Sequence, residues 1–197
     1  MGGVDKPLLT VGGTTILARV IAAMALPVVA ISANGDPARF ADHALPVLDD
    51  GPFRDQGPLA GLLAGLDWTF ALGFSGLLSL PGDTPFVPPG LACVLSPAPS
   101  CAAEAGGRTH PLIALWPVAA RGMLRDLLSR PGPRDVRRFA AMIDMRRVDF
   151  PPAAWDRFMN VNTPEDLARA RALAARTDSG TGKPGTGRRA QDEEERA

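Results

Sequence analysis

Three polar residues each follow a short apolar segment of the sequence. They are Asn34, Asp50 and Asp83, and the segments before them cover residues 28–33, 45–49 and 76–80. Short apolar runs bounded by turn-forming residues are typical of buried strands. Where strands alternate with helices, ligands bind at the carboxyl ends of the strands. The pattern therefore predicts that these three side chains share one site.

Asp83 has the strongest chemical signal of the three. It lies in the stretch Pro-Gly-Asp-Thr-Pro at 81–85, directly after an apolar run. A carboxylate held there is able to ligate Mg²⁺, and Mg²⁺ bridges and neutralises nucleotide phosphates. The alternative is a turn aspartate that only accepts backbone N–H groups. The residues alone leave both interpretations open.

Lys6 follows a Gly-Gly-Val-Asp stretch and is able to reach a phosphate as a point charge, although a solvated surface lysine is the alternative. Asp49 precedes Asp50, and because neighbours on a strand point to opposite faces, only one of the two is expected in the site. Gly57 and Pro58 open a predicted helix. One interpretation is that free N–H groups at its start face an anion or a base; the alternative is that the small residues there serve only packing.

A second group of candidates lies in two later loops. Arg108 and His110 belong to the Gly-rich stretch 106–111. An arginine suits a phosphate or the edge of a pterin, whereas the default role for the histidine is packing or capping. Asn160 and Asn162 precede the last predicted helix, and their amides either bind a ligand or form turns.

The expected elements alternate between helix and strand, which predicts a three-layer α/β fold with a mostly parallel sheet covered by helices on both faces. We expect a single domain at 1–176 and a disordered polar tail at 177–197, where no apolar periodicity remains. Expected helices cover 13–26, 58–72, 118–130, 134–143 and 163–176, and expected strands cover 28–33, 45–49, 76–80, 110–117 and an edge strand at 146–150.

Composition narrows the class of protein. The formal net charge of the 197 residues is zero, which argues against broad electrostatic binding to nucleic acid. Two cysteines form neither a metal cage nor a disulfide scaffold, and no apolar run is long enough to span a bilayer. We therefore expect a cytoplasmic protein without a membrane partner. No nucleophile–base pair is evident.

Seven stretches of the chain, taken in order, resemble the molybdenum-cofactor guanylyltransferase family, often called MobA. The Gly-Asp-Thr-Pro and Asn-x-Asn-Thr-Pro pieces are weak singly, but the ordered set across residues 1–173 is specific. The matching stretches are MGGVDKPLL (1–9), ISAN (31–34), LDD (48–50), GPLAG (57–61), PGDTPFVPP (81–89), RTHP (108–111) and NVNTPEDL (160–167).

The resemblance implies the nucleotide-diphospho-sugar transferase type of fold and a reaction. Family members join GMP, taken from GTP, to the terminal phosphate of molybdopterin or its molybdenum form; Mg²⁺ assists and pyrophosphate leaves. The matching motifs carry over four groups of roles. GTP binding falls to Lys6, Asn34, Asp50, Gly57 and Pro58; catalysis to Lys6 and Asp83; Mg²⁺ ligation to Asp83; and the pterin side to Arg108, His110, Asn160 and Asn162.

The sequence departs from the family pattern at its start. In the family, a buried strand, a Leu-Ala-Gly-Gly phosphate loop and an arginine precede the segment that matches Met1 to Lys6. Loss of that strand is expected to leave a gap in the sheet with unpaired backbone on both sides. We expect the natural protein to begin upstream; the alternative is a short form with weak or no activity.

Two other functions remain open at this stage. One is a related nucleotidyltransferase that uses CTP or another phosphorylated acceptor, since base choice depends on a few hydrogen bonds. The other is an N-terminally truncated, non-catalytic protein that binds GTP or molybdopterin and hands it on. For the guanylyltransferase itself, the expected partners are GTP and molybdopterin as substrates, with transient contact to other molybdenum-cofactor biosynthesis or acceptor proteins.

Overall fold

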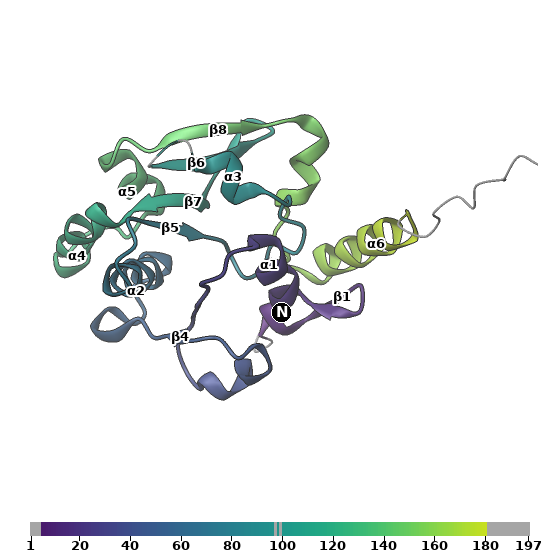
Figure 1. Ribbon diagram of the computed structural model, residues 1–197, viewed down its shortest axis with the longest axis horizontal. Helices are drawn as coiled ribbons and strands as arrows, with labels where there is room; N and C mark the ends of the chain where they lie inside the picture. Colours follow the sequence, from purple (N-terminus) through teal and green to yellow (C-terminus); the bar gives the residue numbers. More distant parts are fainter. Residues whose placement is uncertain (1–4, 97, 99, 181–197) are drawn as a thin grey trace, which may run out of the picture.

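The structure, a computed structural model, describes residues 5–96, 98 and 100–180. Its centre is a mixed four-stranded sheet in the order β5-β7-β6-β8, in which β6 pairs antiparallel with β7 and parallel with β8 (Figure 1). The β5–β7 pair is also antiparallel. The strands are β5 (Gly76–Ser79), β6 (Cys101–Ala105), β7 (Arg108–Pro117) and β8 (Arg146–Phe150).

A second, much smaller sheet carries part of the predicted site. It consists of β3 (Ile31–Ser32) and β4 (Val47–Leu48), which pair in parallel. Among the described residues it has no strand pairing with the four-stranded sheet. A hairpin of β1 (Thr10–Val11) and β2 (Thr14–Thr15) precedes both sheets and turns at two glycines with positive φ.

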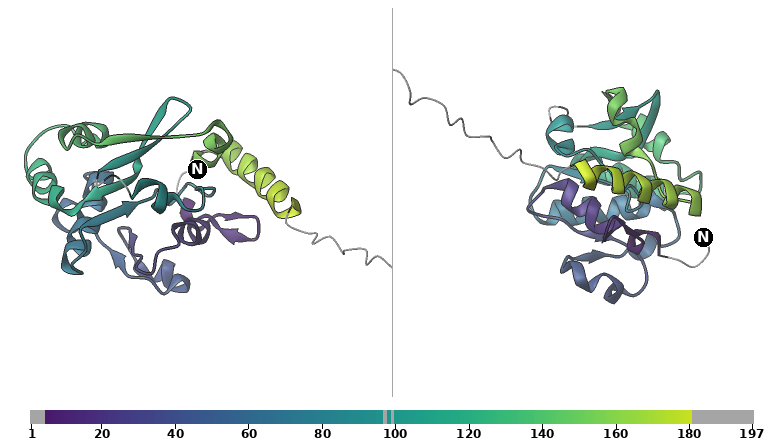
Figure 2. Two further views of the ribbon diagram at one scale, coloured as in Figure 1. Left: turned by 45° about the horizontal axis from the view of Figure 1, so that its top comes forward. Right: turned by 90° about the vertical axis from the view of Figure 1, so that its right-hand side faces the viewer.

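Helices cover both faces of the four-stranded sheet, as Figures 1 and 2 show. One face packs on α2 (Pro58–Ala71), α4 (Arg121–Ser129) and α5 (Val136–Met142), around a buried Trp116 that stacks on Phe139. The other face packs on α3 (Leu91–Leu95) and on residues near the end of α1 (Ile16–Met24). The last helix, α6 (Pro164–Gly180), packs with α1 in a separate cluster. Short 3-10 turns are η1 (Lys6–Leu8), η2 (Pro37–His43), η3 (Gly51–Phe53), η4 (Val118–Ala120) and η5 (Pro152–Phe158).

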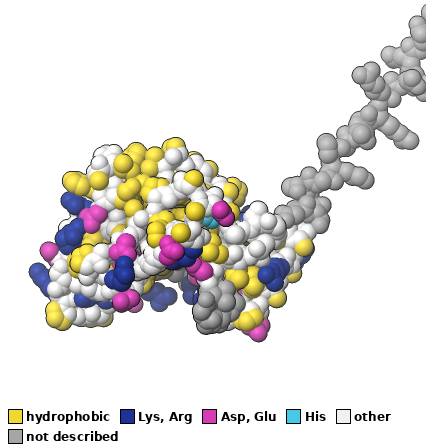
Figure 3. Space-filling view, turned by 90° about the horizontal axis from the view of Figure 1, so that it is seen from below, with side chains coloured by type: hydrophobic (Ala, Val, Ile, Leu, Met, Phe, Trp, Pro, Cys, Tyr) yellow, Lys and Arg dark blue, Asp and Glu magenta, His cyan; other side chains and the backbone are white. Residues whose placement is uncertain are grey.

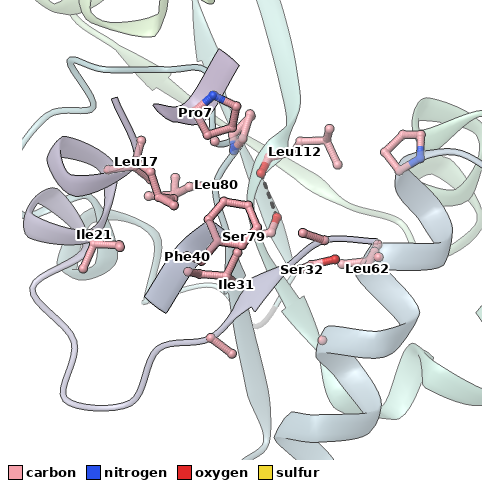
Figure 4. A pocket seen from close by; sticks show the side chains of 18 of the residues that line it. Pro7, Leu17, Ile21, Ile31, Ser32, Phe40, Leu62, Ser79, Leu80 and Leu112 are labelled. Atoms are coloured by element: carbon pink, nitrogen blue, oxygen red, sulfur yellow. Dashed lines mark hydrogen bonds between the residues drawn. The ribbon is translucent and has the colours of Figure 1, made fainter. Parts of the chain in front are cut away.

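An apolar cavity of about 430 Å³ lies between β3 and β5, and we call it the slot. Helix α1 contributes Leu17 and Ile21 to its wall, and Ile31, Leu62 and Leu80 come from other elements (Figure 4). The slot is thus bounded by the two sheets and by helices, which are the surroundings of a central strand in an α/β fold.

On both sides of the slot, some backbone N–H and C=O groups have no strand partner among the described residues. Ile31 N–H bonds Pro46 O at 2.8 Å and Ala33 N–H bonds Leu48 O at 2.9 Å, so the alternation of a parallel pair turns the N–H and C=O of Ser32 towards the slot. Between β5 and β7, the bond from Val118 N–H to Ser75 O (2.9 Å) makes Ser75 and Val118 a hydrogen-bonded pair. Hydrogen-bonded and non-hydrogen-bonded pairs alternate along an antiparallel ladder, so the N–H and C=O of Leu78 point away from β7. In the described part of the chain, no strand joins β3 to β5 across the slot.

The α/β fold class is confirmed, but the sheet is mixed rather than mostly parallel. The first helix begins at Ile16 rather than residue 13, because the Gly12-Gly13 turn forms the unexpected β1–β2 hairpin. Helix α6 extends to Gly180, four residues beyond its expected end at 176, and residues 181–197 of the expected tail lie outside the described residues. No helix in the described ranges is long and apolar enough to cross a membrane.

Candidate functional site

Asp83 lies where three distant parts of the chain meet. It follows β5, and its carbonyl accepts the N–H of Val161 at 2.8 Å, which ties the loop to the segment before α6. The buried Thr84 hydroxyl lies 3.5 Å from Asp83 Oδ1 and 3.4 Å from Asn160 Oδ1. Lys6 Nζ donates to Asn162 Oδ1 at 2.9 Å. We call Lys6, Asp83, Asn160 and Asn162, with Thr84, the carboxylate corner.

The electrostatics of Asp83 fit a cation-binding role. Burial raises the pKa of its carboxyl above the ordinary aspartate value, and the nearby positive charge of Lys6 offsets only part of that shift. An anionic carboxylate at this position therefore lacks full compensation from the protein, which a divalent cation supplies. The carboxyl is also held at a loop between prolines, so its position is fixed by the backbone.

The start of α6 positions Asn162. The Asp166 carboxylate accepts the N–H groups of Asn162 (3.1 Å) and Thr163 (2.9 Å), and the Thr163 hydroxyl accepts the N–H of Asp166 at 3.1 Å. This is a reciprocal helix cap, as the Thr-Pro-Glu-Asp sequence predicts. The backbone hydrogen bonds lower the pKa of Asp166 below its ordinary value.

Asn34 and Asp50 form a second cluster, which we call the amide corner. Asn34 Nδ2 donates to Asp50 Oδ2 at 2.7 Å, and Asn34 Oδ1 accepts the backbone N–H of Asp50 at 3.1 Å. Asp49 points elsewhere and pairs with Arg54, and a bond from the N–H of Gly51 holds the pKa of Asp49 below its usual value. The two neighbouring aspartates thus point to different sides, and only Asp50 lines the slot.

The start of α2 borders the amide corner. Gly57 and Pro58 line the slot together with Asn34 and Asp50. At Gly61, one turn into the helix, an added Cβ would lie 2.5 Å from Ser32 Oγ and 3.4 Å from Asp50 Oδ1. Gly61 therefore permits the close approach of α2 to β3, which fits the packing role of small residues that the GPLAG stretch indicates.

Among the described residues, no hydrogen bond or ion pair joins Arg108 or His110 to either corner. The His110 ring packs on Phe158, with 5.2 Å between ring centroids, and burial, with a smaller contribution from Arg108, lowers the pKa of His110. Phe158 lies two residues before Asn160, so the contact with His110 helps to hold the segment that carries Asn160. Arg108 lines a separate cavity of about 600 Å³ beside α5, together with Arg137 and Arg147.

The sequence analysis did not single out Thr84 or Arg39. Arg39 in η2 bonds both Asp5 and the carbonyl of Asn34, and so joins the segment that carries Lys6 to the amide corner. Its signal in the sequence is weak, because an arginine in a polar loop is usually solvated. Thr84 stands inside a recognised motif, but its burial becomes visible only in the fold.

A profile described as the MobA-like NTP transferase domain matches residues 1–147. The chain belongs to this family. Curated relatives include the molybdenum cofactor guanylyltransferases of Acidiphilium cryptum, 53% identical over 87% of this chain and 88% of that protein, and of Cereibacter sphaeroides, 49% identical over 88% and 90%. The resemblance found in the seven sequence stretches is thereby confirmed.

Solved structures of similar fold support the architecture. One is the molybdopterin-guanine dinucleotide biosynthesis protein A from Archaeoglobus fulgidus, with a TM-score of 0.67, 19% identity and coverage of 88% of this chain and 92% of that chain. Another is 2-C-methyl-D-erythritol 4-phosphate cytidylyltransferase from Thermus thermophilus, with a TM-score of 0.58, 22% identity and coverage of 86% and 94%. These likenesses show the nucleotidyltransferase fold of the MobA-like family.

Within this MobA-like fold the two corners offer complementary chemistry. One presents an ammonium group and a buried carboxylate, and the other presents an amide–carboxylate pair beside a helix start. No group of three or more His, Cys, Asp or Glu side chains suited to a metal occurs in the described part of the chain. A single carboxylate still suits Mg²⁺, which binds one or two carboxylates and completes its shell with substrate phosphates and water.

Proposed function

We propose that this chain transfers GMP from GTP to the terminal phosphate of molybdopterin or its molybdenum form, and releases pyrophosphate. The observation that carries the proposal is the meeting of Lys6, Asp83 and the Asn160–Asn162 segment in one corner. The curated relatives named above bear the name molybdenum cofactor guanylyltransferase, which supports the choice of nucleotide and acceptor.

Two sets of residues divide the binding of GTP. Lys6 contacts the phosphates as a point charge, because its ammonium is held by Asn162 beside the Asp83 carboxylate. The guanosine lies towards the amide corner, where Asn34, Asp50 and the N–H groups after Gly57 and Pro58 offer donors and acceptors. An edge with both kinds of groups suits the lactam edge of guanine.

Asp83 would hold Mg²⁺. The ion would supply charge neutralisation for the triphosphate and for the pyrophosphate that leaves. The protein's own part is to keep a desolvated carboxylate in place, through the bond from Val161 N–H and the Thr84 contact. Desolvation strengthens its attraction for a cation.

The acceptor approaches from the side of Asn160 and Asn162, near Phe158, on which His110 packs; Arg108 lies two residues before His110 on β7. A phosphate oxygen of the acceptor attacks the α-phosphorus of GTP, the bond from that phosphorus to the bridging oxygen breaks, and pyrophosphate departs. The new bond is a phosphoanhydride between the acceptor phosphate and GMP. Such transfer needs in-line positioning and charge stabilisation rather than a protein nucleophile.

The face shown in Figure 3 carries basic and acidic side chains interspersed, without one dominant sign. This distribution agrees with the zero formal net charge and favours small, locally bound anions over an extended polyanion. The choice of small-molecule substrates over nucleic acid therefore rests on the charge pattern as well as on the family.

The test is a substrate comparison. The full chain is incubated with molybdopterin and Mg²⁺, and pyrophosphate release is measured with GTP and with CTP under the same conditions. We expect release with GTP and little with CTP. Preference for CTP would favour the cytidylyltransferase alternative, which the fold likeness to a cytidylyltransferase keeps open. Binding of GTP without release would favour the non-catalytic alternative.

A further inference from the structure

Arg39 links two parts of the site that are far apart in the sequence. Its guanidinium binds the Asp5 carboxylate at 2.7 Å and donates to the carbonyl of Asn34 at 2.7 Å. It also donates to the carbonyl of Asp36 at 3.1 Å and lies 4.5 Å from the centre of the Phe40 ring. The planar fork is therefore fixed on several sides.

The two ends of this bridge belong to different corners. Asp5 directly precedes Lys6, whose ammonium bonds Asn162 in the carboxylate corner. Asn34 bonds Asp50 in the amide corner through its side chain. A chain of side-chain and main-chain links therefore runs from one corner to the other, and Arg39 is its central member.

The bridge matters because no strand ladder joins the two corners among the described residues. The β3–β4 sheet, which carries Asn34 and Asp50, is separated from β5 by the slot. The side chains of Arg39 and Asp5 are 31% and 36% exposed, so their ion pair contributes little to stability. The contacts of Arg39 are better suited to fixing the distance between the Asp5–Lys6 segment and the Asn34 turn than to stabilising the fold.

We propose that Arg39 is a positioning residue of the nucleotide site, which holds the Asn34 turn and the Lys6 segment at a fixed separation through the Asn34 carbonyl and the Asp5 carboxylate. This inference rests on the proposed function, since it assumes that a nucleotide spans the two corners. Arg39 itself acts through Asn34 and Lys6. Its effect falls on GTP binding, before the chemical step.

The experiment compares Arg39→Gln, Arg39→Lys, Asp5→Asn and the double variant Arg39→Gln/Asp5→Asn in the full chain. Arg125→Gln is the matched control, because Arg125 makes a similarly exposed ion pair, with Asp67 at 2.6 Å, on the far side of α2. Steady-state pyrophosphate release gives kcat and separate KM values for GTP and molybdopterin. Calorimetry with GTP alone gives its Kd, and melting curves report folding.

We expect Arg39→Gln to raise the KM and Kd for GTP about tenfold, while kcat and the KM for molybdopterin change less than about threefold. Arg39→Lys keeps the charge but loses the fork, so it should lie between the wild type and Arg39→Gln. Because the two residues act through one bridge, the double variant should be no worse than the weaker-binding single variant. Arg125→Gln should behave as the wild type.

Three results would overturn the proposal. One is an unchanged KM for GTP in Arg39→Gln. Another is a fall in kcat and melting temperature at constant KM, which a purely structural role predicts. The third is additive losses for Arg39→Gln and Asp5→Asn. If the wild-type chain neither binds nor turns over GTP, the proposed function fails, and this inference fails with it. If the wild type binds and turns over GTP and the Arg39 variants behave like it, only the bridge is refuted.

Discussion

The two sheets that carry the site are held in place by different means. In the four-stranded sheet, β7 is paired on both edges over several residues, and Trp116 and Phe139 pack beneath it. In the small sheet, β3 and β4 pair over two residues each and have the slot on one side. In the carboxylate corner, Asp83 follows β5, which is hydrogen-bonded along its length to the large sheet. The amide corner has no such sheet behind it and depends on α1, α2 and side-chain bridges.

Hydrogen exchange should show the largest contrast between the two sheets. We expect the amides of Ile31 and Ala33 to exchange at least about a hundredfold faster than those of Ala102 and Ala114, because short ladders open without global unfolding. Exchange measured by NMR at neutral pH checks this. Equal protection in both sheets would mean that they open only together, and would contradict the contrast.

Truncation of a core side chain should cost more in the large sheet than in the small one. Leu124→Ala removes a fully buried side chain packed beneath the four-stranded sheet and should lower the free energy of unfolding by about 3–4 kcal/mol. Ile31→Ala should cost about 1–2 kcal/mol, because Ile31 already borders a cavity. Denaturant unfolding gives both values, and a reversed order would contradict the account.

Gly61 tests the contact between α2 and the small sheet. Gly61→Ala places a methyl group 2.5 Å from Ser32 Oγ and should lower stability by about 1–3 kcal/mol and weaken GTP binding. Gly122→Ala in α4 is the matched control, since nothing lies within 4 Å of its added Cβ, and it should stabilise by about 0.5–1 kcal/mol. Melting curves separate the two; similar shifts would refute the close approach.

Asp83 and Asp166 should affect the pH dependence of stability in opposite directions. The pKa of Asp83 is raised in the folded state by burial, so its ionisation opposes folding at neutral pH and this cost is relieved as the pH falls through the raised value. Asp83→Asn should therefore stabilise the protein slightly at pH 7 and leave it unchanged well below the ordinary aspartate pKa of about 4.

Asp166 should show the opposite sign, because backbone hydrogen bonds lower its pKa in the folded state. Its contribution is present above the ordinary aspartate pKa and is lost as the pH falls through the lowered value. Asp166→Asn should therefore destabilise at pH 7, with a difference that shrinks in acid. Melting temperatures of both variants from pH 3 to 7 check the signs, and parallel curves for the two would refute them.

Much of the site was predictable because strand ends and helix starts have local signals. Asn34, Asp50 and Asp83 stand directly after apolar runs, and the Thr163–Asp166 cap is encoded within four residues. The predicted shared site is present as two corners rather than one cluster. What joins them, through Arg39 and Asp5, lies 34 residues apart in sequence and has no local pattern.

The misjudged parts of the fold have physical reasons. Strand β6 (Cys101–Ala105) was not expected because alanine has low strand propensity, yet it is buried between β7 and β8 and fixed by their ladders. Its antiparallel pairing with β7 makes the sheet mixed. The gap between β3 and β5 in the described residues was expected only through the family resemblance, because no residue of the sequence signals it by itself.

The most direct test of the central claim is Mg²⁺-dependent pyrophosphate release from GTP with molybdopterin. It is run on this chain with and without Asp83→Ala. The account predicts release by the unchanged chain, and loss of release in Asp83→Ala at an unchanged fold. No release by the unchanged chain, or wild-type rates in Asp83→Ala, would contradict it.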